Sequence, residues 1–315
     1  MNNQRWRLSL LSSLLLLSSA AQPVIIYETG FERSEGYQSN QALIGQLGWE
    51  GLGLEGHSVE DFDDYGRTAL VGFYQPLEED GVKPNSISVW RPLRFDPLGE
   101  SLPIVDFSVF FEIVPSEVGE NDEFRWSAFN LNEEPLFKFN FDTFSGEISF
   151  SSDGGENFDL LGFNFQPGGF YHFAVTMNFE RNLLSATLNG LVIANGLPIT
   201  ATDAELTLGD IDAVWVLIDP ENPGDNFMLF DDYRVIASSI GSIPSIVEVI
   251  PNREEETFSL LVFGEPDRVY TLEESSNLND WTPLSSIAAP ADGIIELVTR
   301  NSMDNRPVFY RAWTP

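Results

Sequence analysis

The stretch FYHFAVTMNFERNLLSATLNGLVI, residues 170–193, decides the fold class. Residues 171–177 alternate between large apolar side chains and smaller or polar ones, which is the period of a strand with one buried face. Further on, Asn189-Gly190 precedes the apolar residues 191–193. Asn-Gly favours a two-residue hairpin turn, because both turn residues take positive φ. The stretch therefore predicts consecutive antiparallel strands.

The same alternation recurs along the chain, and long stretches of helical period are missing. It is clearest in residues 105–113, 122–129 and 136–141. The continuous apolar run Ala213–Ile218 predicts a strand buried on both faces. Many short strands separated by Gly-, Pro- and Asp-rich turns predict an all-β, two-sheet antiparallel jelly-roll sandwich.

A stretch of small residues, Ser238–Pro244, predicts a domain boundary. Four shorter strand patterns follow it, at residues 257–263, 269–273, 294–298 and 308–312. They predict a second, smaller β-sandwich-like domain. The expected organisation is a signal peptide at 1–21, a jelly-roll domain at 22–240 and a small C-terminal β-domain at 241–315.

The N-terminal residues have the three parts of a secretory signal peptide. Arg5 and Arg7 form the positive region, Leu8–Leu17 the apolar region, and Ala20-Ala21 a small-residue cleavage site. An uncleaved anchor is the alternative, although the apolar run is short for a bilayer span, and no other segment is long enough. We therefore expect a secreted protein, extracellular or at the cell surface, with no membrane span.

The chain is strongly acidic, with 49 Asp and Glu against 16 Lys and Arg and a formal net charge of −33. Such a surface repels phosphate backbones, so nucleic acid is excluded as a partner, and it attracts cations. A general role in solubility is the alternative explanation of the charge. Because the chain has no Cys, disulfides and thiolate metal sites are excluded as well.

Three stretches resemble known families. Residues 170–193 resemble the central hairpin of laminin-G-like, concanavalin A-like jelly rolls, with Phe170 where the family usually has Trp. Tyr27–Glu32 (YETGFE) and Phe227–Val235 (FMLFDDYRV) resemble the first and last strands of jelly-roll carbohydrate-binding modules. These resemblances imply a jelly roll, but jelly rolls host lectins, adhesins, hydrolases and lyases alike.

The third resemblance lies in the C-terminal region. Residues 258–312, with the segment from Tyr270 to Trp281 and the triplet Phe309-Tyr310-Arg311, resemble a small C-terminal domain of secreted proteins from Verrucomicrobia-type bacteria. The resemblance places Trp281 in the core of that domain.

A candidate metal site follows from the first and last strands, which usually meet in a jelly roll. Glu32 lies near the first strand and Asp231-Asp232 lie in the last. Their hard carboxylate oxygens suit Ca²⁺. The resemblance to carbohydrate-binding modules implies a structural Ca²⁺ held by Glu32 and by Asp231 or Asp232. The alternative is that all three are solvated acids at strand ends.

A candidate ligand-binding face follows from strand alternation. In residues 136–141 the three phenylalanines share one face, whereas Lys138 and Asn140 share the other. By the same alternation, Arg125 and His172 lie on the non-core faces of their strands. If these strands are neighbours, the four residues form a positive patch; otherwise they are ordinary solvent-facing residues.

The tryptophans divide into two groups. Trp90, Trp126 and Trp215 lie in strand-like runs, which favours the core. Trp49 lies in the Gly-rich segment GQLGWEGLG, where an exposed role in stacking on a sugar is possible.

The favoured function is a non-catalytic module that binds an extracellular polysaccharide or glycan, or serves in cell-surface or matrix recognition. The alternative is a polysaccharide-active enzyme, a lyase or glycoside hydrolase, that uses the polar face. No catalytic residue is assigned, because the Glu-x-Asp-x-x-Glu strand motif of laminarinase-type glucanases is absent and His57 and His172 are the only histidines.

Overall fold

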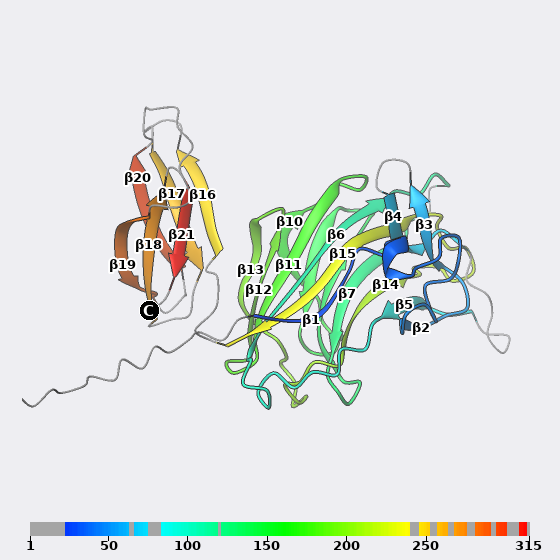
Figure 1. Cartoon of the computed structure of the whole chain (residues 1–315). Coiled ribbons are helices and arrows are strands. Elements are labelled where there is room, and N and C mark those ends of the chain that lie inside the picture. The colour runs from blue at the N-terminus through cyan, green and yellow to red at the C-terminus, as the bar shows by residue number, and fades with distance from the viewer. Residues whose placement is uncertain are drawn as a thin grey trace, which may run out of the picture.

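Among the residues that it describes, the computed structural model has twenty-one strands and one short 3₁₀ helix (Figure 1). The signal peptide predicted for residues 1–21 lies outside the described residues and stays a prediction. The described residues are 23–62, 66–74, 83–118, 121–239, 246–252, 257–263, 268–275, 281–290, 294–300 and 309–313.

Two large antiparallel sheets form the main part of the chain, as predicted, and we call them sheet A and sheet B. Sheet A consists, in order, of β13 (Leu191–Pro198), β12 (Leu183–Leu188), β11 (Phe170–Asn178), β6 (Ile104–Val114), β15 (Phe227–Ser238), β4 (Gly66–Gly72) and β3 (His57–Phe62), and β1 (Val24–Thr29) also pairs with β15. Sheet B consists of β10 (Asp159–Asn164), β9 (Glu147–Ser151), β8 (Pro135–Phe141), β7 (Glu123–Phe129), β14 (Asp210–Val216), β5 (Ser86–Trp90) and β2 (Glu50–Leu52).

The sheets are stacked face to face, and one continuous core fills the space between them (Figure 1). Inward-facing side chains alternate with outward-facing ones along each strand, which is the pattern of a β-sandwich. Aromatic rings dominate this core; among them are Trp49, Trp126, Trp215, Tyr233 and Phe139. The all-β jelly-roll sandwich expected from the sequence is confirmed.

The hairpin that decided the fold class forms as predicted. Leu188 pairs with Leu191 across the turn. Asn189 and Gly190 between them have φ values of 51° and 79°, the positive values that this turn requires.

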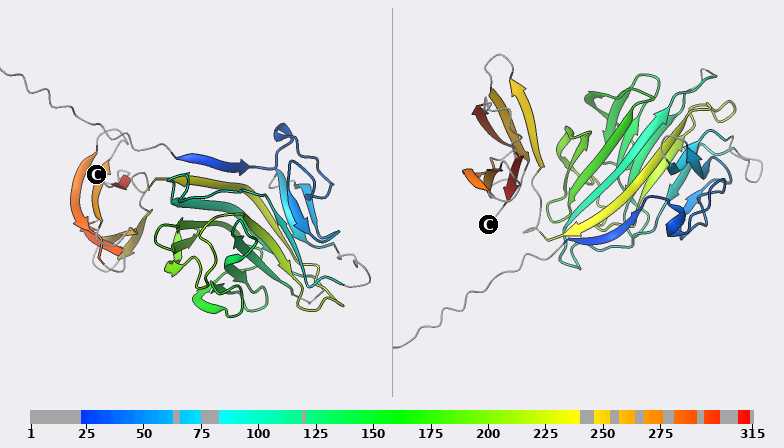
Figure 2. Two further views of the ribbon diagram at one scale, coloured as in Figure 1. Left: turned by 90° about the horizontal axis from the view of Figure 1, so that it is seen from below. Right: turned by 45° about the horizontal axis from the view of Figure 1, so that its top comes forward.

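The first strand joins the last, also as expected. β1 runs antiparallel to β15, and the two lie side by side in both views of Figure 2. After β1 the chain turns through η1 (Arg33–Glu35), where the Glu35 carboxylate accepts hydrogen bonds from the Thr29 hydroxyl and the Gly30 amide. Within the described residues no helix is long and apolar enough to cross a membrane.

The strand predicted from residues 213–218 differs from expectation. β14 starts earlier, at Asp210, and only one of its faces packs into the core. Ala213 and Trp215 enter the core, whereas Val214 and Val216 line a groove on the outer face of sheet B. This apolar outer face gave the strand its continuous hydrophobic pattern.

The C-terminal strands form two three-stranded sheets with a core of their own. Trp281 is half-buried, with the Arg311 guanidinium 4.2 Å from its ring centre, rather than in this core. The predicted boundary at 238–244 falls largely on residues outside the described ranges and stays a prediction. One sheet contains β16 (Ile246–Asn252), β17 (Thr257–Phe263) and β20 (Ile294–Arg300), and the other β19 (Thr282–Ala288), β18 (Val269–Ser275) and β21 (Phe309–Trp313).

Candidate functional site

The four residues predicted to form one positive patch lie on two different sheets. Arg125, Lys138 and Asn140 lie together on the outer face of sheet B, where Arg125 pairs with Asn140 across β7 and β8. His172 lies on β11 in sheet A, directly across from Phe110. Each residue faces away from the core as predicted, but a single patch of all four is wrong, because alternation gives a residue's face and does not give the sheet that its strand joins.

Arg125 and Lys138 line a groove of about 470 Å³ on the outer face of sheet B, and we call it the sheet B groove. It crosses the middle strands β8, β7, β14 and β5. Its lining combines aromatic rings, cationic donors and carboxyl groups, the mixture found in pockets for polar organic ligands. The lining residues are Leu52, Asn85, Ser86, Ser88, Trp90, Arg125, Ser127, Phe129, Glu133, Lys138, Asp210, Asp212, Val214 and Val216.

Arg125 is held in place by partners on three sides. Its Nε donates to Asn140 Oδ1 at 2.7 Å, and a terminal nitrogen donates to Glu123 Oε2 at 3.1 Å. The ring of Phe158 covers the guanidinium at 4.8 Å. Because Glu123 compensates its charge, Arg125 acts as a fixed hydrogen-bond donor rather than as a free cation.

Lys138 donates to the Gly154 carbonyl at 2.7 Å. Burial and, next, the Arg125 charge lower the pKa of Lys138, while the Asp153 and Asp212 carboxyl groups oppose this effect. An ammonium group has three hydrogens to donate, so Lys138 retains donors for a ligand or for the neighbouring acid.

Asp210 and Asp212 are the groove residues that the sequence analysis missed. They lie on β14, and Asp212 pairs with Ser127, which in turn pairs with Lys138. Asp212 is 5% exposed, and its Oδ1 has no hydrogen-bond partner. A buried, unpartnered carboxyl oxygen in a groove lining is costly to folding, so a ligand that donates to it is an evident reason for its presence.

The carboxyl groups of Asp210 and Asp212 interact with each other, and their like charges disfavour ionisation of both at once. Burial, together with the charges of Glu133 and Glu50, raises the pKa of Asp210 to about 6, although a hydrogen bond with Asp212 opposes the rise. Burial, followed by the Asp210 charge, raises the pKa of Asp212 well above its usual range. The pair therefore offers both an acceptor and a carboxylic acid donor.

Two tryptophans, Trp49 and Trp90, lie in the opposite environment to the one expected from the sequence. Trp49 is buried, its Nε1 donates to the Tyr37 hydroxyl at 2.8 Å, and its ring packs on Phe31, so a stacking role for Trp49 is wrong. Trp90, expected in the core, is half-buried on the outer face and lines the sheet B groove. Its neighbour Val89 pairs with Ala213, which places Trp90 beside Asp212.

The three predicted metal ligands lie close together. A Cβ on Gly30 would lie 3.5 Å from Asp232 Oδ1, 3.7 Å from Asp231 Oδ1 and 3.8 Å from Glu32 Cγ. All three line one pocket of about 540 Å³ beside β1 and β15, and we call them the acidic cluster. The expected meeting of these acids at the first and last strands is therefore found.

The acidic cluster fits a cation in its chemistry but is not a preformed coordination shell. Burial, together with the nearby charges of Asp232, Glu32 and Glu35, raises the pKa of Asp231 to about 7. Among the described residues, no three His, Asp or Glu side chains are arranged around one point as metal ligands would be. A bound cation would relieve the repulsion and would require the carboxylates to rotate toward it.

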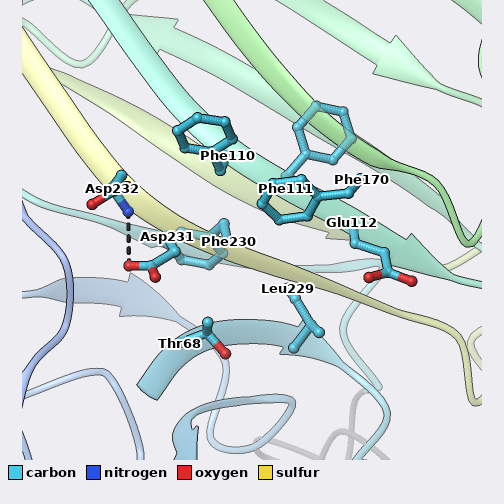
Figure 3. Close-up of a pocket in the computed structure, with 9 residues that line it drawn as sticks. All are labelled: Thr68, Phe110, Phe111, Glu112, Phe170, Leu229, Phe230, Asp231 and Asp232. Carbon is cyan, nitrogen blue, oxygen red and sulfur yellow. Dashed lines mark hydrogen bonds between the residues drawn. The ribbon is translucent and has the colours of Figure 1, made fainter. Parts of the chain in front are cut away.

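A further pocket of about 280 Å³ adjoins the acidic cluster on the outer face of sheet A, and we call it the sheet A pocket (Figure 3). His172, assigned from the sequence to the ligand face, lies nearby, with its ring 4.7 Å from that of Phe110. The lining residues are Thr68, Phe110, Phe111, Glu112, Phe170, Leu229, Phe230, Asp231 and Asp232.

No protein-family model matches the sequence, and a search of curated proteins finds no match. Several solved structures are similar to the chain, and 69% of this chain is covered in each of the following three. A sialidase has a TM-score of 0.46 and 10% identity, with 19% of its own chain covered. A conserved carbohydrate esterase from the Shiga toxin-encoding bacteriophage phi24B has a TM-score of 0.48, 11% identity and 100% of its chain covered, and the basic winged bean lectin has 0.45, 10% and 99%. The matching part thus spans only a small share of the sialidase.

The two stacked antiparallel sheets make this part of the chain an antiparallel jelly-roll β-sandwich. The likenesses concern this fold and assign neither a ligand nor an activity. The resemblance of the C-terminal region to the Verrucomicrobia-type domain stays a prediction.

Proposed function

We propose that the protein is a secreted, non-catalytic module that binds an extracellular polysaccharide or glycan in the sheet B groove. The observation that carries the proposal is the buried Asp212 carboxyl, whose Oδ1 has no hydrogen-bond partner, beside the half-buried Trp90 ring. A pyranose has an apolar C–H face that stacks on an aromatic ring and hydroxyls that donate to carboxylates. Trp90 and Asp212 offer these two contacts side by side.

The groove favours a neutral glycan. Arg125 is already paired with Glu123, and the Lys138 ammonium lies near Asp212. Glu133 and the Asp210–Asp212 pair add negative charge to the lining, as does the chain as a whole. A uronate or sulfate group would meet few uncompensated cations there, whereas neutral hydroxyls find both donors and acceptors.

The arrangement of the acids favours binding over cleavage. Glycoside hydrolases hold their two carboxyl groups about 5–5.5 Å or about 6.5–9.5 Å apart, so that the sugar or a water fits between them. Asp210 and Asp212 are instead in hydrogen-bonding reach of each other. Polysaccharide lyases need a Tyr or His to move a proton, and the described residues that line the groove include neither.

Replacing Trp90 with Ala should weaken glycan binding by about 2 kcal/mol, or roughly thirtyfold in Kd, because the stacking surface is lost. Trp90→Phe keeps an aromatic ring and should retain most of the affinity. A glycan array of neutral oligosaccharides identifies the best ligand, and calorimetry then measures its Kd for the three proteins.

Phe144→Ala is the matched control, because it removes a ring that is 86% exposed and does not line the sheet B groove. It should leave the affinity for the neutral glycan unchanged. Equal affinities in the wild type and the Trp90→Ala variant, with both proteins folded, would contradict the proposal. So would an array on which no glycan binds.

We also propose a structural Ca²⁺ at the acidic cluster. A ligand that binds only the folded state stabilises it by about 2.7 kcal/mol at a hundredfold excess over Kd. For a domain of this size, Ca²⁺ should raise the melting temperature by about 5–10 °C. Mg²⁺ at the same concentration supplies the same screening but prefers a tighter octahedral site, so its effect should be smaller.

The double variant Asp231→Asn, Asp232→Asn, or the single variant Glu32→Gln, should remove the difference between the two metals. Asp232 has a φ of 48°, a value that Asn adopts readily, so the backbone is preserved. If Ca²⁺ and Mg²⁺ give equal shifts that persist in these variants, the acids form a solvated surface and hold no Ca²⁺.

A further inference from the structure

The sheet A pocket has an aromatic floor that is open to solvent. The rings of Phe110 and Phe170 are nearly parallel, at 10°, with centres 5.3 Å apart. Phe170 is 51% exposed. The His172 ring also contacts Phe110, with the two ring centres 4.7 Å apart. A row of rings on an otherwise acidic surface provides a platform for a flat, partly apolar ligand.

Carboxylates flank this platform. Asp231 pairs with Phe110 on one side, and Glu112 pairs with Phe170 on the other. In Figure 3 their carboxyl groups lie on opposite sides of the pocket. Glu112 Oε2 is buried without a hydrogen-bond partner, and no ion pair to either acid is found in the part of the chain that the structure describes. The platform thus carries acidic groups without a cationic partner, and Glu112 is the one with a buried oxygen left without a hydrogen bond.

A second buried polar group points to a ligand. Thr68 lines the pocket, is 3% exposed, and its Oγ1 has no hydrogen-bond partner. Figure 3 shows Thr68 and Leu229 on the side of the pocket opposite Phe110. A buried hydroxyl without a partner costs folding free energy, so a polar ligand group in the pocket would stabilise the protein there.

We propose that the sheet A pocket binds a sugar unit that carries a free amino group. The apolar face of the pyranose lies on Phe110 and Phe170, and its ammonium lies against Glu112 or Asp231. This site goes beyond the glycan binding proposed for the sheet B groove, which lies on the other sheet, and it shares Asp231 and Asp232 with the proposed Ca²⁺ site.

Charge selects the amino sugar over other glycans. Covering an unpaired carboxylate with a neutral ligand removes water that solvates the charge, and hydroxyls compensate it less well than an ammonium does. An ammonium is also attracted to the faces of the rings. An anionic sugar is repelled by the acids and by the net charge of −33. A bare metal ion makes no use of the rings.

The test compares short glucosamine oligosaccharides with N-acetylglucosamine oligosaccharides of the same length, which lack the charge. Calorimetry is done in EDTA, so that no divalent cation competes for Asp231. The glucosamine oligosaccharide should bind at least about tenfold more tightly. Phe170→Ala and Glu112→Gln should each weaken its binding about tenfold or more.

Two matched variants separate a built site from general attraction to an acidic protein. Glu100→Gln removes the same charge from an exposed turn, and Phe144→Ala removes a ring that is 86% exposed between β8 and β9. Neither should change the affinity. If Glu100→Gln and Glu112→Gln weaken binding equally, or if the acetylated oligosaccharide binds as tightly as the amino one, the proposal is overturned.

The Trp90→Ala variant keeps this test separate from that of the proposed function. It should lose the neutral glycan of the sheet B groove and bind the glucosamine oligosaccharide with unchanged affinity. Loss of both ligands in Trp90→Ala, with the protein still folded, would contradict a separate site on sheet A. Failure to bind any neutral glycan leaves the amino-sugar comparison intact.

Discussion

Replacing Asp122 with Ala should destabilise the sandwich by about 3–5 kcal/mol, because three buried donors lose one shared acceptor. The Asp122 carboxylate is 2% exposed. It accepts hydrogen bonds from Trp215 Nε1 at 3.0 Å, from the Ile218 amide at 2.9 Å and from the Gly224 amide at 2.9 Å. For a domain of this size the melting temperature should fall by about 10 °C or more.

The Asp122 contacts also matter for the sheet B groove. Trp215 lies on β14, the strand that carries Asp210 and Asp212, and its indole is anchored only through this carboxylate. Residues 218 and 224 belong to the loop that leads from β14 to β15. Loss of the carboxylate therefore loosens the end of the strand that positions the acids of the groove.

Thermal unfolding followed by circular dichroism measures the effect. Asp203→Ala is the control, because Asp203 is exposed in a loop and its loss should change the melting temperature by less than about 2 °C. Asp122→Asn keeps one acceptor oxygen, so its melting temperature should lie between those of the two alanine variants. A melting temperature of Asp122→Ala close to that of Asp203→Ala would show that the buried contacts contribute little.

The local sequence was sufficient to predict most strands and which side chains of each strand face the core. The Asn189-Gly190 turn was predictable because its positive φ values are a property of the residues themselves. The outward orientation of Lys138 and Asn140 followed from the period of two, which tertiary contacts do not change.

Long-range pairing was not predictable in the same way. His172 faces outward as expected, but its strand joins sheet A through a pairing with β6, which lies some sixty residues earlier in the chain. The meeting of Glu32 with Asp231 and Asp232 was predictable only because jelly rolls usually bring the first and last strands together.

The Asp210–Asp212 pair left a signal in the sequence that the hydrophobic run obscured. In DIDAVWV, residues 210–216, Asp210 and Asp212 alternate with Ile211 and Ala213, so the period of two places both acids on the outer face. The run of apolar residues after position 212 suggested two buried faces instead. Val214 and Val216 are apolar because they line the groove.

Replacing Asp212 with Asn should stabilise the protein at neutral pH, although it alters a residue of the candidate site. The pKa of Asp210 is raised to about 6 and that of Asp212 further, whereas both carboxyl groups have ordinary values in the unfolded chain. Between about pH 4 and 6 the folded protein therefore binds more protons than the unfolded one, and its stability falls as pH rises. Above this window the loss that comes from Asp210 is complete, and the loss from Asp212 continues at higher pH.

The expected change in stability follows from the same pKa shift. A carboxyl whose pKa rises by about two units reduces stability by about 2–3 kcal/mol above pH 6. In Asp212→Asn the amide donates to Asp210, whose carboxylate then ionises nearer its usual pH. Stability at pH 7 should rise by about 2 kcal/mol, and the decline between pH 4 and 6 should flatten. Urea unfolding at a series of pH values measures both quantities.

The same variant should bind the neutral glycan at least about tenfold more weakly, because the buried acceptor of the groove is gone. Asp203→Asn, an exposed carboxyl in a loop, should change neither the pH dependence nor the affinity. If a buried acid destabilises the fold and is present because it binds a ligand, its replacement should raise stability and weaken binding. If Asp212→Asn loses stability at pH 7 and keeps its affinity, Asp212 supports the sandwich and has no part in binding.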